Sequence, residues 1–158
     1  MADNSPEQLL ELARGHGFSA QRLYGVALEE GKYRYPSNPY KFAFNGPYSL
    51  STHYLLTLSL ELMLKAAFVA WGGDRSDKSL KSMRHDLREC LCKANELGFI
   101  TNAPMIDEVV RLLRDPYRLD SLRYRSRSKL RLPNIDVVIN CLAVLDDEVA
   151  SAINASAL

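Results

Sequence analysis

Hydrophobic residues run almost without interruption through residues 54–71, in the segment YLLTLSLELMLKAAFVAW. Among its few polar residues, Glu61 and Lys65 stand four positions apart, which places them on one face of a helix in the order that favours an ion pair. This charged pair argues against a membrane span, because ions are expensive at the centre of a bilayer. The segment therefore predicts a helix that starts at Ser51 or Thr52 and is buried on nearly all sides.

Shorter segments around this block repeat apolar residues at helical spacing and end at recognisable capping residues. Ser5 and Pro6 suit the first turn of a helix, which Gly15-His16-Gly17 would end. The predicted helices, including the central one, cover residues 5–15, 19–31, 51–71, 86–98, 102–115 and 133–150. These patterns predict an all-α fold, an up-and-down bundle of five to six helices.

The segments between these helices differ in character. Residues 32–50 contain three prolines and six aromatic residues, which predicts an irregular loop packed over the bundle, with a partner surface as the alternative. The polar residues 74–85 predict a mobile connection. Asp115-Pro116 is expected to break a helix, because proline cannot continue the hydrogen-bond ladder. Residues 1–150 are predicted to form one domain and residues 151–158 a frayed tail.

Composition adds limits to this picture. The chain has 158 residues, of which 47% are hydrophobic and 25% charged, as in an ordinary globular domain. The net charge is +1, so any basic binding site must be local. Cys90, Cys92 and Cys141 lack the spacing of a zinc or redox motif, and the N-terminus lacks a signal-peptide pattern. We therefore expect a cytoplasmic protein with no cofactor, no metal site and no membrane contact.

The central helix and the segment after it carry a family resemblance. SLELMLKAAFVAWGG is followed, after a polar connection, by RHDLRECLCKANELG. An apolar helix of the form LELxLKA, a loop with glycine and an HDL motif resemble the HEPN superfamily of helical domains, over about residues 50–100. The resemblance implies a helical bundle that forms a homodimer. It also implies RNA, a nucleotide or a nucleotidyltransferase-like protein as partner, in defence or toxin–antitoxin systems.

Glu61, Lys65 and His85 form a predicted polar cluster independently of that resemblance. A buried charge without a partner costs several kcal/mol, so Glu61 and Lys65 need partners. His85 lies just before Asp86, a predicted helix cap, and could donate a hydrogen bond to Glu61. The cluster is interpreted as a structural clasp between two helices, with a catalytic or ligand site as the alternative.

The ribonuclease members of the superfamily carry an Arg-x(4–6)-His motif that this chain lacks. His16, His53 and His85 are its only histidines, and none follows an arginine at that spacing. The resemblance therefore implies a non-catalytic branch, or an enzyme with a rearranged site. For such a site the candidate residues are Arg84, His85 and Asp86.

A second candidate site is the basic segment LRYRSRSKLRL, residues 122–132. An extended backbone would place its alternating cations on one face, namely Arg123, Arg125, Arg127, Lys129 and Arg131. Such a row would suit a phosphate backbone, with Tyr124 stacked on a base. One alternative is an exposed loop whose arginines pair with acidic helix faces, such as Glu29-Glu30 or Asp146-Asp147-Glu148. The other is a dimer contact.

Three functional hypotheses follow from these residues. The leading one is a non-catalytic HEPN-like module that binds RNA, a nucleotide or a protein partner. The second is a metal-independent ribonuclease with an atypical site around Arg84 and His85. The third is a protein-binding scaffold that uses the aromatic segment at residues 33–48.

Overall fold

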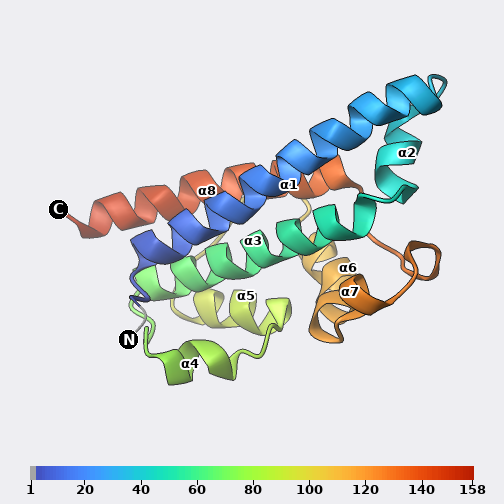
Figure 1. Ribbon diagram of the computed structural model, residues 1–158. Helices are drawn as coiled ribbons and strands as arrows, with labels where there is room; N and C mark the ends of the chain where they lie inside the picture. The colour runs from blue at the N-terminus through green and yellow to red at the C-terminus, as the bar shows by residue number, and fades with distance from the viewer. Residues whose placement is uncertain (1–2) are drawn as a thin grey trace.

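The computed structural model describes residues 3–158 and is built from helices alone in that part of the chain (Figure 1). Its elements in chain order are α1 (Pro6–Arg34), α2 (Pro39–Asn45), α3 (Ser49–Ala70), α4 (Asp77–Ser82), α5 (Leu87–Glu96), α6 (Ile106–Arg118), α7 (Ser121–Tyr124), the 3-10 turn η1 (Arg127–Lys129) and α8 (Ile135–Ser156). The all-α prediction is confirmed. The predicted five to six helices are too few, since these residues form eight α-helices.

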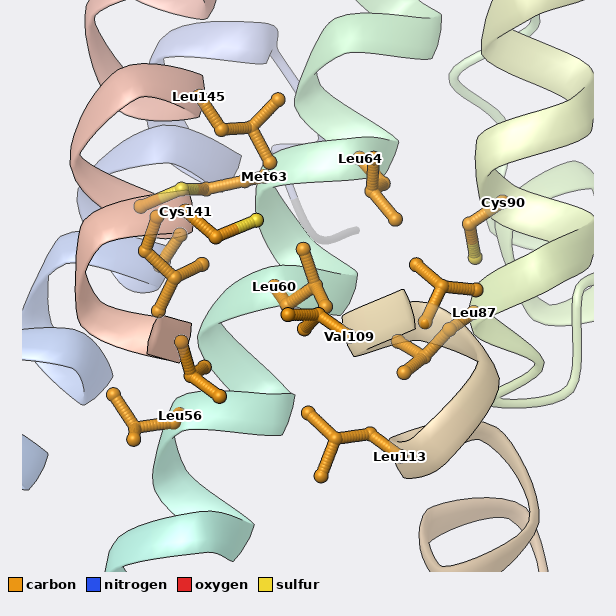
Figure 2. Close-up of a cluster of buried hydrophobic side chains, with 14 of the residues drawn as sticks. Leu56, Leu60, Met63, Leu64, Leu87, Cys90, Val109, Leu113, Cys141 and Leu145 are labelled. Atoms are coloured by element: carbon orange, nitrogen blue, oxygen red, sulfur yellow. The ribbon is translucent and has the colours of Figure 1, made fainter. Parts of the chain in front are cut away.

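The long helices α1, α3 and α8 lie side by side, and α3 runs antiparallel to α1 (Figure 1). The shorter α5, α6 and α7 cover the other side of α3. Figure 2 shows leucines of α3 meeting apolar side chains of α5, α6 and α8. The labelled residues are Leu56, Leu60, Met63, Leu64, Leu87, Cys90, Val109, Leu113, Cys141 and Leu145. Each fully buried leucine contributes about 1.5–3 kcal/mol to folding, so α3 organises the core.

α3 also has the length and apolar composition of a membrane span. However, 67% of the residues in its most apolar window are buried inside the bundle. This burial is typical of a core helix, and helices of that kind pass the same length and composition test. Its polar residues Thr52, Thr57 and Ser59 are buried too, and each donates a hydrogen bond to a backbone carbonyl.

The predicted break at Gly15-His16-Gly17 is wrong, because α1 continues through it to Arg34. Packing explains this continuity. Gly17 faces α3, where an added Cβ would lie 3.0 Å from the hydroxyl oxygen of Ser59. That hydroxyl donates to the carbonyl of Ala13 at 2.7 Å. Small residues thus let α1 and α3 approach closely, and this contact outweighs the helix-propensity cost of glycine, about 1 kcal/mol each.

Three further expectations about elements are wrong, and for α4 and α8 the reason is again that tertiary contacts override local signals. The predicted mobile connection contains α4, whose Leu80 is buried. α6 passes through Pro116 and ends at Arg118. α8 continues past the expected fraying point to Ser156, and Ile153 is buried within this extension.

The aromatic segment at residues 32–50 contains a helix, α2, and only part of it packs on the core. Phe44 and Tyr48 are half-buried against the hydrophobic cluster. The exposed aromatic side chains of the segment are Tyr33, Tyr35 and Tyr40. The expectation of an irregular loop is therefore wrong at Pro39–Asn45, the expected packing on the bundle holds for part of the segment, and the partner surface stays a prediction.

Two glycines of α1 allow a matched test of this packing. An added Cβ at Gly31 would lie 2.8 Å from the carbonyl oxygen of Pro39, whereas nothing lies within 4 Å of one at Gly25. Gly25→Ala should therefore raise the free energy of unfolding by up to about 1 kcal/mol, because alanine favours the helix. Gly31→Ala should lower it by about 1–3 kcal/mol through overpacking. Urea denaturation of the two variants checks both, and equal effects would contradict the close approach of α1 and α2.

Candidate functional site

The carboxylate of Glu61 lies at the centre of the candidate site and is 2% exposed. Lys65, one turn later in α3, approaches it with its Nζ atom 2.5 Å from Oε1. The imidazole Nδ1 of His85 lies 3.0 Å from Oε2. The hydroxyl of Tyr117, in α6, donates to the same oxygen. The structure therefore brings Glu61, Lys65 and His85 together and adds a fourth residue. We call these four residues the Glu61 cluster.

The sequence does not predict that Tyr117 belongs to the cluster, because Asp115-Pro116 is expected to end the helix before it. Instead Pro116 lies in the last turn of α6, and the helix carries Tyr117 onto Glu61. The sequence did hold a signal, since Val110, Leu113 and Tyr117 recur at helical spacing and all three are buried. The ring of Tyr117 also meets the His85 ring edge-on, with 5.7 Å between centroids.

His85 reaches Glu61 from a turn with unusual backbone angles. Arg84 and His85 both have positive φ angles, of 48° and 59°. Non-glycine residues rarely adopt this left-handed conformation, which costs about 1–3 kcal/mol. The turn is held in place by Asp86, whose carboxylate caps α5 through the N–H groups of Arg88 and Glu89.

Asp86 is held by a second helix as well. The guanidinium of Arg114, in α6, donates two hydrogen bonds to its carboxylate, at 2.9 and 2.8 Å. The Arg114 hydrogen bonds hold the pKa of Asp86 below its usual value. Of the three residues predicted for an atypical enzyme site, Asp86 thus works as a cap and ion-pair partner, while Arg84 is exposed.

The charges within the Glu61 cluster balance. Burial alone would raise the pKa of Glu61, but the Lys65 ammonium and the hydrogen bonds from Lys65, Tyr117 and His85 lower it overall. Burial and the neighbouring Glu61 charge raise the pKa of Tyr117, so its phenol stays protonated and donates. Burial also raises the pKa of the nearby Cys90 thiol to about 12, which leaves it a poor nucleophile.

His85 is the one member of the cluster that faces solvent. Its side chain is 69% exposed, although its Nδ1 lies against the buried carboxylate. Among residues 3–158, nothing lies within hydrogen-bonding distance of its Nε2. A carboxylate that accepts from Nδ1–H leaves Nε2 unprotonated in the neutral ring, ready to accept a proton from outside. Chemically, the arrangement can therefore act as a general base.

The other two histidines take structural positions. His53 is buried in α3, with its Nε2 2.9 Å from the carbonyl oxygen of Pro133. Burial lowers the pKa of His53, which favours the neutral ring. His16 is half-buried on α1.

The predicted extended row of cations is wrong, because α7 and η1 fold the basic segment into two short turns. Arg127 turns inward and is half-buried. Its Nε donates to the carbonyl of Phe44 and to the hydroxyl of Ser49, and its guanidinium lies 4.2 Å from the centroid of the Phe44 ring. Arg127 therefore fastens the segment to α2 and α3 instead of facing a ligand.

The remaining members of that row stay on the surface. The guanidinium of Arg123 lies over the ring of Tyr124, and its Nη1 is 3.8 Å from Oδ1 of Asp120. Tyr124 itself is 75% exposed. The other three exposed cations, Arg125, Lys129 and Arg131, form no ion pair with any residue between 3 and 158. We call Arg123, Tyr124, Arg125, Lys129 and Arg131 the basic surface.

The acidic helix faces considered as partners for these arginines bind other groups. Glu29 pairs with Lys32, and Glu30 pairs with Arg34 and accepts from Tyr48. Asp146 pairs with Arg14, and Glu148 accepts from Thr101 and Asn102. In the described residues, therefore, none of Arg125, Lys129 and Arg131 forms an ion pair with these acidic faces, whereas Arg123 is paired with Asp120.

Within residues 3–158, no three His, Cys, Asp or Glu side chains lie close enough together to hold a metal ion. In comparisons with known proteins, no family model, no curated protein and no solved structure matches the chain.

The Glu61–Lys65 pair predicts a specific pattern of stability. Glu61→Gln leaves the Lys65 ammonium buried without its counter-charge, so the free energy of unfolding should fall by about 3–5 kcal/mol. The double variant Glu61→Gln, Lys65→Met should recover most of that loss, because neither charge is then buried. Urea denaturation at pH 7 measures both. A double variant that is no more stable than Glu61→Gln would show that the pair is not the main interaction.

The stabilities of the wild type and the double variant should depend differently on pH. Because the folded pKa of Glu61 is lowered, the unfolded chain binds more protons in the acid range, and stability rises with pH there. The ionised carboxylate of Glu61 contributes to the free energy of unfolding above its unfolded pKa of about 4.5. This contribution is lost as the pH falls through the folded pKa of Glu61. The stability difference between the wild type and the double variant should therefore shift toward the double variant below pH 4.5. A difference independent of pH would contradict an ionised Glu61.

Proposed function

We propose that this protein is a non-catalytic HEPN-like helical module that binds single-stranded RNA through the basic surface. One observation supports it most: Arg125, Lys129 and Arg131 are exposed cations that form no ion pair within residues 3–158, and Tyr124 of the same segment is exposed as well. No acidic residue occurs in the sequence between Asp120 and Asp136. Phosphate groups are the partners that would neutralise such a surface, and binding would release counterions.

Tyr124 favours a single strand over a duplex. Its ring is exposed, and one side lies against the guanidinium of Arg123, 5.1 Å from the ring centroid. An unpaired base can stack on such a ring, whereas a paired base is covered by its neighbours in the duplex. Aromatic stacking beside a track of cations is the usual way to bind single strands without strong sequence preference.

The inward position of Arg127 supports this proposal in a second way. Its contacts with Phe44, Ser49 and the carbonyl of Leu130 hold the segment around η1 in one conformation. Neighbouring cations on this frame lose less conformational freedom on binding than cations on an unattached loop. In this proposal Arg127 holds the segment in place, and its exposed neighbours bind the RNA.

Neutralising the exposed cations tests the proposal. The triple variant Arg125→Gln, Lys129→Gln, Arg131→Gln should weaken binding of a fluorescent single-stranded RNA. The slope of log K against log salt should fall by up to about 2, since each phosphate contact contributes about 0.7. Fluorescence anisotropy over a range of salt concentrations measures both quantities.

A matched control removes the same charge elsewhere. Arg22, Lys78 and Lys81 are also exposed, so replacing these three with glutamine changes the net charge equally. This control should keep near wild-type affinity and slope. If both triple variants weaken binding to the same extent, only overall charge matters and the basic surface is not the site. Arg127→Gln should instead lower the melting temperature, because it leaves two buried carbonyls and a hydroxyl without their donor.

A second candidate function, a metal-independent ribonuclease, is favoured by the pairing of Glu61 with His85. Nε2 of His85 could accept the proton of an RNA 2′-hydroxyl. The 2′-oxygen would then form a bond to the adjacent phosphorus while the bond to the 5′-oxygen breaks. The 5′-oxygen would leave as a hydroxyl after taking a proton from water, and the other product would be a 2′,3′-cyclic phosphate. The exposed Arg84, next to His85, is the residue at hand to stabilise charge on the phosphate.

Incubation of labelled RNA with the protein in EDTA distinguishes the two functions. The proposed binding module should leave the RNA intact. Cleavage that produces cyclic phosphate ends, and that is lost in His85→Ala with an unchanged melting temperature, would overturn the non-catalytic proposal. The variant is suitable because the His85 side chain is largely exposed, so its removal leaves no cavity in the core.

A further inference from the structure

A concave site lies along α2, and none of its lining residues belongs to the Glu61 cluster. It is a cavity of about 570 Å³ formed by α2 and the segments just before and after it, and it is lined by aromatic, amide and hydroxyl side chains and one cation. In Figure 1, α2 folds back from the far end of α1, at the end of the bundle that also carries the loop after α7. We call this cavity the α2 pocket.

Two stacked rings form the apolar part of the α2 pocket. Tyr35 and Phe42 stack with 5.4 Å between centroids and 23° between planes. Phe42 is held by glycines on both sides, since an added Cβ at Gly31 or Gly46 would lie 3.2 Å from its ring. Tyr35 is 57% exposed. A fixed ring therefore supports an exposed one, which leaves an aromatic surface available to a planar ligand.

The polar part of the α2 pocket offers hydrogen-bonding groups and one cation. Asn38 caps α2 through its Oδ1, which accepts from the N–H of Lys41, so its amide N–H₂ group remains available to a ligand. Asn45 and Ser37 add a second amide and a hydroxyl. The ammonium of Lys41 forms no ion pair with any of residues 3–158.

We propose that the α2 pocket binds one nucleobase of a single-stranded RNA, with the base stacked on Tyr35, its edge hydrogen-bonded by the amides and its phosphate on Lys41. Planar shape, polar edge and attached negative charge are what this combination of groups would recognise. The inference rests on the proposed RNA binding and names a second contact for the same ligand.

The α2 pocket and the basic surface are physically connected. The guanidinium of Arg127 contacts Phe44, while Phe42, two positions earlier in the same short helix, lines the pocket. α2 therefore has the basic segment on one side and the pocket on another. Arg127, the residue that fastens the basic segment, therefore lies against the same short helix that lines the pocket.

Free mononucleotides test the pocket separately from the basic surface. AMP, GMP, CMP and UMP are titrated into the full chain and followed by calorimetry and by saturation-transfer NMR. At least one should bind. Tyr35→Leu should weaken that binding about tenfold, because stacking on an aromatic ring is lost. Tyr35→Trp should retain it. Tyr40→Leu is the control, since Tyr40 is similarly exposed on α2 but does not line the pocket.

The contribution of Lys41 has its own signature. Lys41→Gln should weaken binding of the mononucleotide about tenfold and leave binding of the matching nucleoside, which has no phosphate, unchanged. Equal losses for nucleotide and nucleoside would show that Lys41 does not hold the phosphate, and would overturn that part of the inference. Circular dichroism and melting curves establish that each variant is folded.

Mononucleotide binding and RNA-oligomer binding test the α2 pocket and the proposed function separately. If none of the four mononucleotides binds, or Tyr40→Leu acts as strongly as Tyr35→Leu, the pocket inference is overturned even when RNA oligomers still bind. The triple variant of the basic surface should lose oligomer binding and keep mononucleotide binding. Mononucleotide binding by a wild-type chain that ignores RNA oligomers would support the pocket and overturn the RNA proposal.

Discussion

The burial of one carboxylate constrains most of this structure. Glu61 sits in the middle of the most apolar helix, where an unpaired charge would cost several kcal/mol. Lys65 supplies a counter-charge from the same helix, but the remaining lone pairs need donors from elsewhere. They come from Tyr117 of α6 and from His85 in the turn before α5. A single charge thus fixes how two neighbouring segments sit against α3.

Apolar packing alone would not fix these segments so strictly. Leucine and valine side chains can exchange neighbours at modest cost when volume is conserved. A hydrogen bond to a buried carboxylate tolerates little displacement. The ion pair between Asp86 and Arg114 adds a second link between the start of α5 and α6. Arg127 adds a third, between the basic segment and the α2–α3 junction. Polar contacts therefore set the register, and the apolar core supplies most of the stability.

The features that could be predicted from the sequence are those governed by contacts within one helix. The central helix follows from its apolar run, and the Glu61–Lys65 pair follows from spacing alone. His85 is associated with them because it lies just before Asp86, a predicted helix cap. Tyr117 could not be found by the same reasoning. A proline in the last turn lacks only one donor, so α6 continues past Pro116, whereas the prediction ended the helix there.

The error in the basic segment has a different cause. Alternating cations define one face only if the backbone is extended, and period-two alternation predicts a strand when one set of residues is apolar and buried. In the basic segment both alternating sets of residues are mostly polar, so burial of one face does not favour the extended conformation. Asp120 instead accepts backbone hydrogen bonds from Arg123 and Tyr124 and starts α7. Leu122 and Leu132, rather than the arginines, reach the core and anchor the two ends of the segment.

This arrangement explains why five similar cations have unequal roles. Burial lowers the pKa of Arg127, yet a guanidinium remains charged, and its charge is spread over two carbonyls, a hydroxyl and an aromatic ring. Arg127 therefore contributes positive potential to the surface without being able to contact a phosphate directly. The exposed cations of the row are free to contact a ligand, and their potential is screened by salt. Charge density along the sequence does not separate these two kinds of cation, because the difference arises only when Phe44 and Ser49 fold against the segment.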